Sequence, residues 1–265
     1  MWDDIRQVYS NAGRFARVMP LVFLLPALPE LMQHVAEVHL GMYASRAAAK
    51  AMAGSGLRLG FGYAKTLALL LPGYWFIRYL AWDDARRAAR LERPAAALWL
   101  VLFAWSGLLQ AWGLFGPGTG ALLGLTGRAA MGVGALVSLV GSVCGVYFTA
   151  WGVAWPLGNA RVGPLRSAKL MVGSFWRTLG YLVACALPLF VMHYALGLGA
   201  IGRPAWMYWP MLVVNAGVVA LLAHCMAGSS FVAARHAARR RGVSLDGGAA
   251  WPVVVASDGA MVPAR

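Results

Sequence analysis

The chain has 265 residues, of which 60% are hydrophobic and only 12% are charged. Soluble domains carry about 25% charged residues, so this composition excludes an ordinary soluble domain and predicts an all-α, polytopic membrane bundle. The net charge of +14 does not indicate nucleic-acid binding, because the basic residues cluster between apolar runs, as they do beside membrane helices.

Long apolar runs predict about six transmembrane helices, since a hydrocarbon core requires about 20 residues per helix. The predicted ranges are 16–41, 59–82, 95–115, 130–155, 174–199 and 205–232. We expect one transmembrane domain over residues 1–241. A flexible tail is expected over residues 242–265, where Gly, Asp and Pro surround a short apolar run.

Basic residues precede the first predicted helix and follow the second, fourth and sixth. This bias predicts that both termini lie in the cytoplasm. Segment 42–58 is an exception, because it carries Arg46, Lys50 and Arg58 on the side of the membrane opposite the two termini. Its Ala-rich composition predicts a short helix that lies on the outer surface of the membrane.

The basic end of the last predicted helix is a candidate site for anionic lipid headgroups, at about 1 kcal/mol per basic residue. The residues concerned are Arg235, Arg239, Arg240 and Arg241. Ordinary anchoring at the cytoplasmic surface explains them equally well. The expected partners are therefore the lipid bilayer, its anionic headgroups and a membrane-protein partner.

Two segments resemble each other. "FARVMPLVFLLPALPELMQH" (15–34) and "FWRTLGYLVACALPLFVMH" (175–193) both begin with Phe-x-Arg, contain Ala-Leu-Pro and reach a His five residues after the Pro. The helices that follow end in "ARRAAR" and "ARHAAR". These similarities predict a parallel repeat of the first two and last two helices, as in some transporters. A chance match between apolar helices is the alternative.

The stretch "PELMQHVAEVHL" places Glu30, His34 and Glu37 on one face of a helix, because their spacings are four and three residues. Counted at 1.5 Å per residue from the basic start of the helix, Glu30 and His34 lie within the membrane. The same count predicts that Glu37 and His39 lie at or beyond the outer interface, in contact with water.

Ionisable side chains at membrane depth are candidate functional residues. His193 is predicted at the same depth as His34, since each follows an Arg by 16 or 17 residues. Lys65 lies near the outer end of its helix and can pair with Glu30. We therefore predict a polar pocket near the outer leaflet, and His224 near the membrane centre is a further candidate. The alternative is a set of structural ion pairs or a water-filled vestibule.

Two histidines at equal depth could hold a metal ion or a haem. No covalent haem-attachment motif and no zinc-type cysteine spacing is present. No cofactor is therefore expected, and a haem or metal at His34 and His193 is the minor alternative. Asn215 and Gln110 are predicted to form hydrogen bonds between helices.

Residues 147–183 read "YFTAWGVAWPLGNARVGPLRSAKLMVGSFWRTLGYLV". An aromatic helix that ends at Pro156, a basic loop with Arg161, and Trp176-Arg177 at the start of the next helix resemble YciC-like bacterial inner-membrane proteins. The pattern is also similar to the membrane domain of some glycerophosphoryl diester phosphodiesterases. This resemblance implies a six-helix envelope protein and supplies no catalytic motif.

Three functions remain open from the sequence. The first is an envelope, lipid-related or small-solute transport protein with a polar pocket. The second is a non-catalytic scaffold, and the third is a haem- or metal-binding redox protein. No catalytic motif is present in the chain, so an enzyme is less favoured than a transport or scaffold protein.

Overall fold

The computed structural model describes residues 1–247, 253–255 and 261–263. The described part is all-α except for one antiparallel pair of short strands. In chain order the elements are α1 (Trp2–Val18), α2 (Pro20–Leu24), α3 (Ala27–His39), η1 (Met42–Ala44), α4 (Arg46–Met52), α5 (Gly56–Leu70), α6 (Gly73–Trp82), α7 (Ala85–Ala89), α8 (Arg93–Phe115), α9 (Thr119–Leu122), α10 (Gly127–Tyr147), α11 (Thr149–Ala154), α12 (Pro164–Met171), α13 (Phe175–Ala200), α14 (Ala205–Arg240), β1 (Val253–Val255) and β2 (Met261–Pro263).

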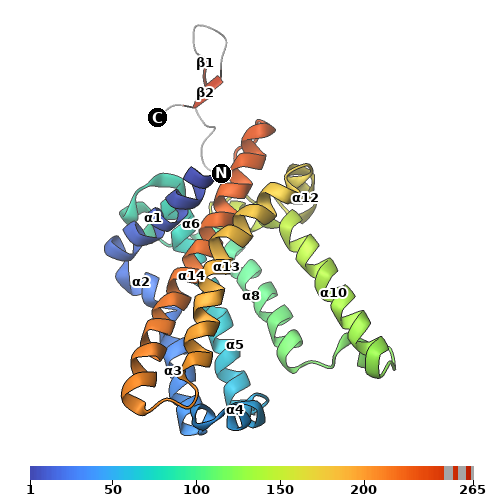
Figure 1. Ribbon diagram of the computed structural model, residues 1–265. Helices are drawn as coiled ribbons and strands as arrows, with labels where there is room; N and C mark the ends of the chain where they lie inside the picture. The colour runs from blue at the N-terminus through green and yellow to red at the C-terminus, as the bar shows by residue number, and fades with distance from the viewer. Residues whose placement is uncertain (248–252, 256–260, 264–265) are drawn as a thin grey trace.

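Five segments of the described chain are long and apolar enough to cross a membrane, which makes this a multi-pass helical membrane protein. They are Pro20–His39, Arg93–Phe115, Gly127–Tyr147, Phe175–Ala200 and Ala205–Arg240. The N terminus, α12 and the last turns of α14 lie at one end of the bundle, which we call the α12 end (Figure 1). Helix α4 lies at the opposite end, the α4 end (Figure 1).

The predicted membrane helix 59–82 is two helices, α5 and α6, which are separated at Leu71 and Pro72. Proline lacks the backbone N–H that a continuing helix needs, so Pro72 starts a new helix. Neither piece is long enough to be one of the five candidate spans. The prediction of six continuous membrane helices is therefore wrong at this position.

The predicted first helix, 16–41, is also divided. It comprises the end of α1, then α2 and α3, with Pro20 and Pro26 at the breaks. Helix α1 is amphipathic and packs on α14, α13 and α6. Its buried residues recur every three or four positions, at Ile5, Val8, Ala12 and Phe15.

Asp4 connects α1 to α13 and α14 through its side chain. Its Oδ2 accepts a hydrogen bond from the Tyr181 hydroxyl on α13 at 2.5 Å and lies 3.4 Å from His236 Nε2 on α14. The hydrogen bond from Tyr181 lowers the pKa of Asp4, and the charge of His236 acts in the same direction.

Helices α13 and α14 form the centre of the bundle. Of the apolar window of α14, 61% is buried, against 6% for α8 and for α10. Pro188 and Pro210 lie inside α13 and α14 without ending them. The two halves of the predicted repeat therefore differ in continuity. The last two predicted helices are the continuous helices α13 and α14, whereas the first two are divided and include the separate helices α3, α5 and α6. The parallel repeat stays a prediction.

The predicted helix 130–155 bends between α10 and α11, and the cause is Ser167 on α12. The Ser167 hydroxyl donates to Tyr147 O at 2.8 Å and accepts from the Trp151 backbone N–H at 2.9 Å. Tyr147 and Trp151 are four residues apart, so the hydroxyl replaces one hydrogen bond of the helix. A side chain inserted in this way kinks a helix.

Arg78 joins the loops at the α12 end, and its side chain is completely buried. Its Nη2 lies 2.7 Å from Glu92 Oε1, and its Nη1 donates to Pro156 O at 3.2 Å. The guanidinium group also lies over the rings of Tyr74 and Trp82, at 4.9 and 4.3 Å. We call these contacts the Arg78 anchor.

The first residues of the predicted tail are packed. Leu245 is buried, Ser244 O accepts a hydrogen bond from the Asn159 side chain, and Asp246 accepts one from Trp82 Nε1. The prediction of a loose tail is therefore wrong for residues 242–247, because they cover the end of α6 and the loop after α11. The predictions for 248–252, 256–260 and 264–265 lie outside the described residues.

Candidate functional site

Nine side chains form a continuous polar cluster toward the α4 end of the bundle, and we call this set the polar cluster. Its members come from α3, η1, α5, α13 and α14. They are Glu30, Gln33, His34, Glu37, Tyr43, Arg58, Lys65, His193 and Asn215.

His34 is at the centre of the polar cluster and is almost completely buried. Its Nε2 lies 3.1 Å from Glu30 Oε1, and its Nδ1 lies 3.1 Å from Glu37 Oε2. Each ring nitrogen therefore faces a carboxylate. The doubly protonated imidazolium is the form in which both nitrogens donate to these oxygens. Tyr43 OH also lies 3.0 Å from Nδ1, and Asn215 Nδ2 lies 3.1 Å from Nε2. This amide can donate to Nε2 only when the ring is neutral and carries its proton on Nδ1.

Glu30 is fully buried and lies inside the candidate span Pro20–His39. Its Oε2 lies 3.0 Å from Lys65 Nζ, and its Oε1 lies 3.7 Å from His193 Nδ1. Both oxygens make ion pairs, yet neither has a hydrogen bond of good geometry among the described residues. A buried carboxylate in this condition retains acceptor capacity for a proton or a polar ligand.

Glu37 corrects one prediction. It is buried rather than in contact with water, with only 3% of its surface exposed. Tyr43 OH donates to Glu37 Oε2 at 2.8 Å, Gln33 Nε2 donates to Oε1 at 2.8 Å, and Arg58 Nε donates to Oε1 at 3.0 Å. The chain after α3 folds back over this carboxylate, and depth counting along one helix does not include such a cover. His39 is exposed, as predicted.

Tyr43 is the cluster member that the sequence analysis missed most clearly. Burial raises the pKa of Tyr43 above its usual range, and the charge of Glu37 adds to that effect. The phenol therefore stays protonated and remains a hydrogen-bond donor. Its position in "HLGMY", beyond a helix end at Gly41 with positive φ (+70°), was the available signal, since a left-handed glycine reverses the chain.

His193 and His34 are brought into one cluster, but indirectly. Asn215 on α14 lies between them, with Oδ1 2.8 Å from His193 Nδ1 and Nδ2 3.1 Å from His34 Nε2. The prediction that Asn215 bonds neighbouring helices is confirmed by these contacts. The direct partners of His34 are Glu30 and Glu37, and His193 is connected to it only through Asn215.

The charges of the polar cluster nearly balance. Glu30 and Glu37 oppose Lys65 and Arg58, so a proton on His34 gives the cluster a net positive charge. Because these groups are within hydrogen-bonding range, a proton gained by one changes the energy of charge on its neighbours. The arrangement can therefore bind a proton or exchange one for a charged ligand.

His224 lies outside the polar cluster. Its Nδ1 donates to Ala220 O on its own helix at 2.8 Å, and no partner for its Nε2 is found among the described residues. The ring is stacked on Phe23 at 4.6 Å and is enclosed by Phe15 and Phe76. The prediction that His224 belongs to the polar pocket is therefore wrong, because it packs among aromatic rings nearer the α12 end.

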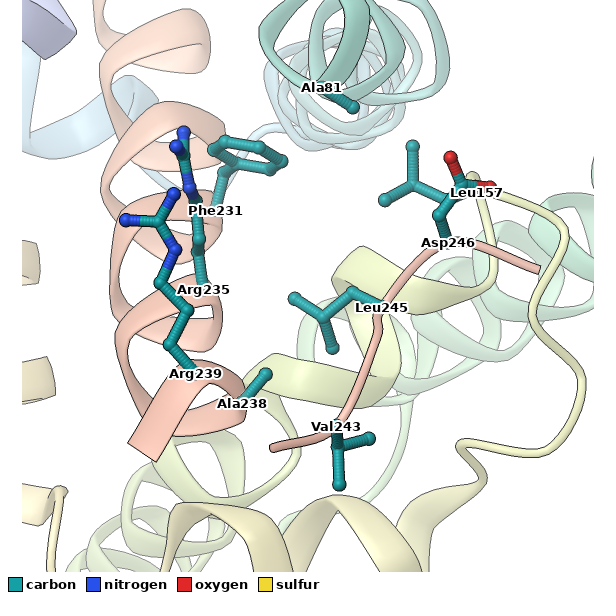
Figure 2. Close-up of a pocket in the computed structure, with 9 residues that line it drawn as sticks. All are labelled: Ala81, Leu157, Phe231, Arg235, Ala238, Arg239, Val243, Leu245 and Asp246. Carbon is teal, nitrogen blue, oxygen red and sulfur yellow. The ribbon is translucent and has the colours of Figure 1, made fainter. Parts of the chain in front are cut away.

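The four predicted headgroup residues at the end of α14 have different surroundings. Arg240 donates to Gly173 O at 3.0 Å and to Val172 O at 2.7 Å, and Arg241 also donates to Val172 O. These two thus stabilise the turn between α12 and α13. Arg235 and Arg239 extend along α14 beside a cavity of about 90 Å³ (Figure 2). Headgroup binding stays a prediction.

Metal binding receives no geometric support within the described chain, where no group of three or more His, Cys, Asp or Glu side chains is arranged to hold a metal ion. His34 and His193 are both neighbours of Glu30, but His34 uses both ring nitrogens on carboxylates and Asn215 uses Nδ1 of His193.

No protein-family model, no curated protein and no solved structure matches this sequence. The class of the molecule is therefore defined by its own features. It is a multi-pass helical membrane protein with a buried cluster of ionisable side chains toward the α4 end and a separate buried arginine at the α12 end.

Proposed function

We propose that this is a bacterial inner-membrane protein that couples movement of a small solute to binding of a proton at the polar cluster. Both termini would lie in the cytoplasm, and the α4 end would face the outer side. Glu30 carries the proposal, because it is a fully buried carboxylate at membrane depth that is shared by Lys65, His34 and His193.

The orientation is supported by the basic residues. Those before α3 and after α6, α11 and α14 lie toward the α12 end, where positive charge favours the cytoplasm. Glu30, His34 and His193 would then lie in the outer half of the membrane. Arg58 and Tyr43 cover Glu37 from the α4 end, so these two residues would have to move for a solute to enter from outside.

A scaffold explains the buried charges less well. Polar residues that only join helices are usually single side chains, each worth about 0.6 kcal/mol. This cluster instead collects two carboxylates, two imidazoles, a lysine and an arginine. Desolvating so many ionisable groups is costly, and transporters use such groups for proton relays.

The test uses proteoliposomes that contain a pH-sensitive dye, with an acidic exterior and a panel of amino acids, sugars, organic cations and carboxylates. We expect one solute class to increase proton entry with the wild-type protein. Glu30→Gln and His34→Gln should abolish that increase, because they remove groups that exchange the proton. Glu92→Gln is the matched control and should retain it, since Glu92 lies at the α12 end. Equal proton entry in wild type and Glu30→Gln for every solute would contradict the proposal.

A further inference from the structure

A second region, independent of the polar cluster, is a large apolar groove of about 600 Å³. We call it the α8 groove. Its walls come from α5, α6, α8, α11, α13 and α14, with the last turn of α10. One face of α8 lines it at spacings of three and four residues, through Trp99, Leu102, Phe103, Ser106 and Gln110. A groove of this size is within the range of about 300–1,000 Å³ typical of ligand sites.

The groove exists because two membrane helices leave the bundle. Helices α8 and α10 diverge from the central pair α13 and α14 (Figure 1). The kink created by Ser167 directs α10 away from the bundle. Gly145 and Gly152 lie in the wall on either side of that kink, and a Cβ atom added at either would meet no atom within 4 Å.

The membrane determines what fills such a space. Large apolar cavities exclude water, because water there lacks polar partners. The groove is lined mainly by apolar and aromatic side chains on membrane-spanning segments, so hydrocarbon is the solvent around it. Acyl chains are the abundant hydrocarbon of a bilayer, so they are the molecules available to fill an apolar groove that opens to it.

Gln110 distinguishes this groove from a plain apolar surface. Its amide is exposed, lies at membrane depth and has no hydrogen-bond partner among the described residues. It is five residues before the end of α8, or about 7 Å along the axis. A glutamine side chain at that depth can reach the ester region of the nearer leaflet. Trp99, at the other end of the lining face, lies about 16 Å further along the helix axis.

We propose that the α8 groove binds one acyl chain of a membrane glycerolipid, with the ester carbonyl of that lipid accepting a hydrogen bond from Gln110. The apolar wall supplies shape and van der Waals contact, and the amide fixes which part of the lipid lies near the α4 end. A helix from a second copy is the competing occupant, because a helix carbonyl keeps a second lone pair and glutamine side chains also bond across membrane helices. The dimer outcome below distinguishes that occupant from lipid.

The first experiment measures lipid retention by native mass spectrometry after repeated washing in mild detergent. Wild type should retain one glycerolipid per chain. The double variant Gly145→Leu/Gly152→Leu fills the groove and should lower the retained fraction at least tenfold. Gly132→Leu/Gly134→Leu is the matched control on α10. It adds the same side chains at two glycines that do not line the groove and have open space around them, so it should retain the lipid.

The second experiment tests Gln110 with phospholipids that differ only in ester or ether linkage. Wild type should prefer the ester lipid by roughly threefold to tenfold, the equivalent of one hydrogen bond. Gln110→Leu should bind both equally, because leucine preserves the apolar wall and removes the donor. This arm remains decisive if the glycine variants do not fold.

Three outcomes overturn the proposal. Wild type could lose all lipid at the first wash, as readily as the filled double variant. Wild type and Gln110→Leu could show the same ester-to-ether ratio. Lastly, a dimer that dissociates when Gly145 and Gly152 are filled would identify a second copy of the chain, rather than lipid, as the occupant.

Discussion

The polar cluster and the Arg78 anchor are both buried, charged regions, but they are constructed differently. Arg78 is a single cation that two aromatic rings and one carbonyl hold in place, and its carboxylate partner Glu92 is 48% exposed. The polar cluster has several titratable groups that share one another as partners, and its carboxylates, Glu30 and Glu37, are both buried.

This difference distinguishes a charge that only holds the fold together from one that can change when a proton is gained or lost. An arginine stays protonated at all accessible pH values, so the buried side chain of the anchor keeps one charge state. In the polar cluster the His34 ring lies between two carboxylates, so a proton gained or lost there would change the charge that its neighbours experience. Burial of charge thus joins loops at the α12 end, and at the α4 end it carries the proposed proton exchange.

Removing Lys65 should have the largest effect. Lys65→Met leaves Glu30 buried without its ammonium partner, and breaking a buried pair costs about 3–5 kcal/mol. We expect a large decrease in the midpoint of thermal unfolding in detergent. The double variant Glu30→Gln/Lys65→Met should recover most of that decrease, because no buried charge is left unpaired. A single variant as stable as wild type would show that the pair contributes little.

Removing Arg78 should have a smaller effect. Arg78→Ala removes two cation–π contacts and leaves a cavity, at a cost of about 2–4 kcal/mol in the same thermal assay. Glu92→Gln is the internal control and should change stability by no more than about 1 kcal/mol, since the carboxylate is half exposed. If Glu92→Gln were as destabilising as Arg78→Ala, the ion pair rather than the aromatic cage would hold the anchor.

Tyr43→Phe tests the cover of the polar cluster. It removes one hydrogen bond to a carboxylate and should cost about 1.5 kcal/mol. Because burial raises the pKa of Tyr43, its contribution is complete below the unfolded value of about 10 and is lost as the pH rises toward the folded value. The thermal midpoint should therefore fall further in wild type than in Tyr43→Phe when the pH is raised from 8 to above 10. Parallel declines would contradict this role.

Asp4→Asn should have the smallest effect, about 1 kcal/mol or less at pH 7, because Asp4 is partly exposed. The hydrogen bond from Tyr181 lowers the pKa of Asp4, so the stabilisation is present above the unfolded value of about 4 and decreases as the pH falls below it. The difference between wild type and Asp4→Asn should shrink between pH 7 and pH 3. A difference that grows in acid would contradict the sign of this shift.

The sequence predicted the membrane helices best where the apolar run has no internal break. Residues 95–115 and 174–199 were predicted to within two residues of α8 and α13 at each end. It failed at Pro72, where hydropathy continues although the helix does not. Proline does not decide this alone, since Pro188 and Pro210 lie inside continuous helices. Whether a helix continues through a proline also depends on its packing against neighbouring helices, and a sequence pattern does not contain those contacts.

For the site, depth along a helix placed Glu30, His34, Lys65 and His193 in one neighbourhood, because rise per residue is fixed. Depth alone did not place Glu37, whose burial depends on Tyr43 and Arg58 arriving from a separate segment. The α8 groove could not be predicted either. It depends on a hydroxyl from α12 entering another helix, which is a tertiary contact without a sequence signature.

The central claim is that Glu30 and its neighbours exchange a proton. Its most direct test is the charge displaced when proteoliposomes on a solid-supported membrane receive a pH step without any solute. Wild type should give a transient displacement current, because a proton binds part-way across the membrane at the polar cluster, and Glu30→Gln should give none while Glu92→Gln retains it. A current of equal size in wild type and Glu30→Gln would contradict the account.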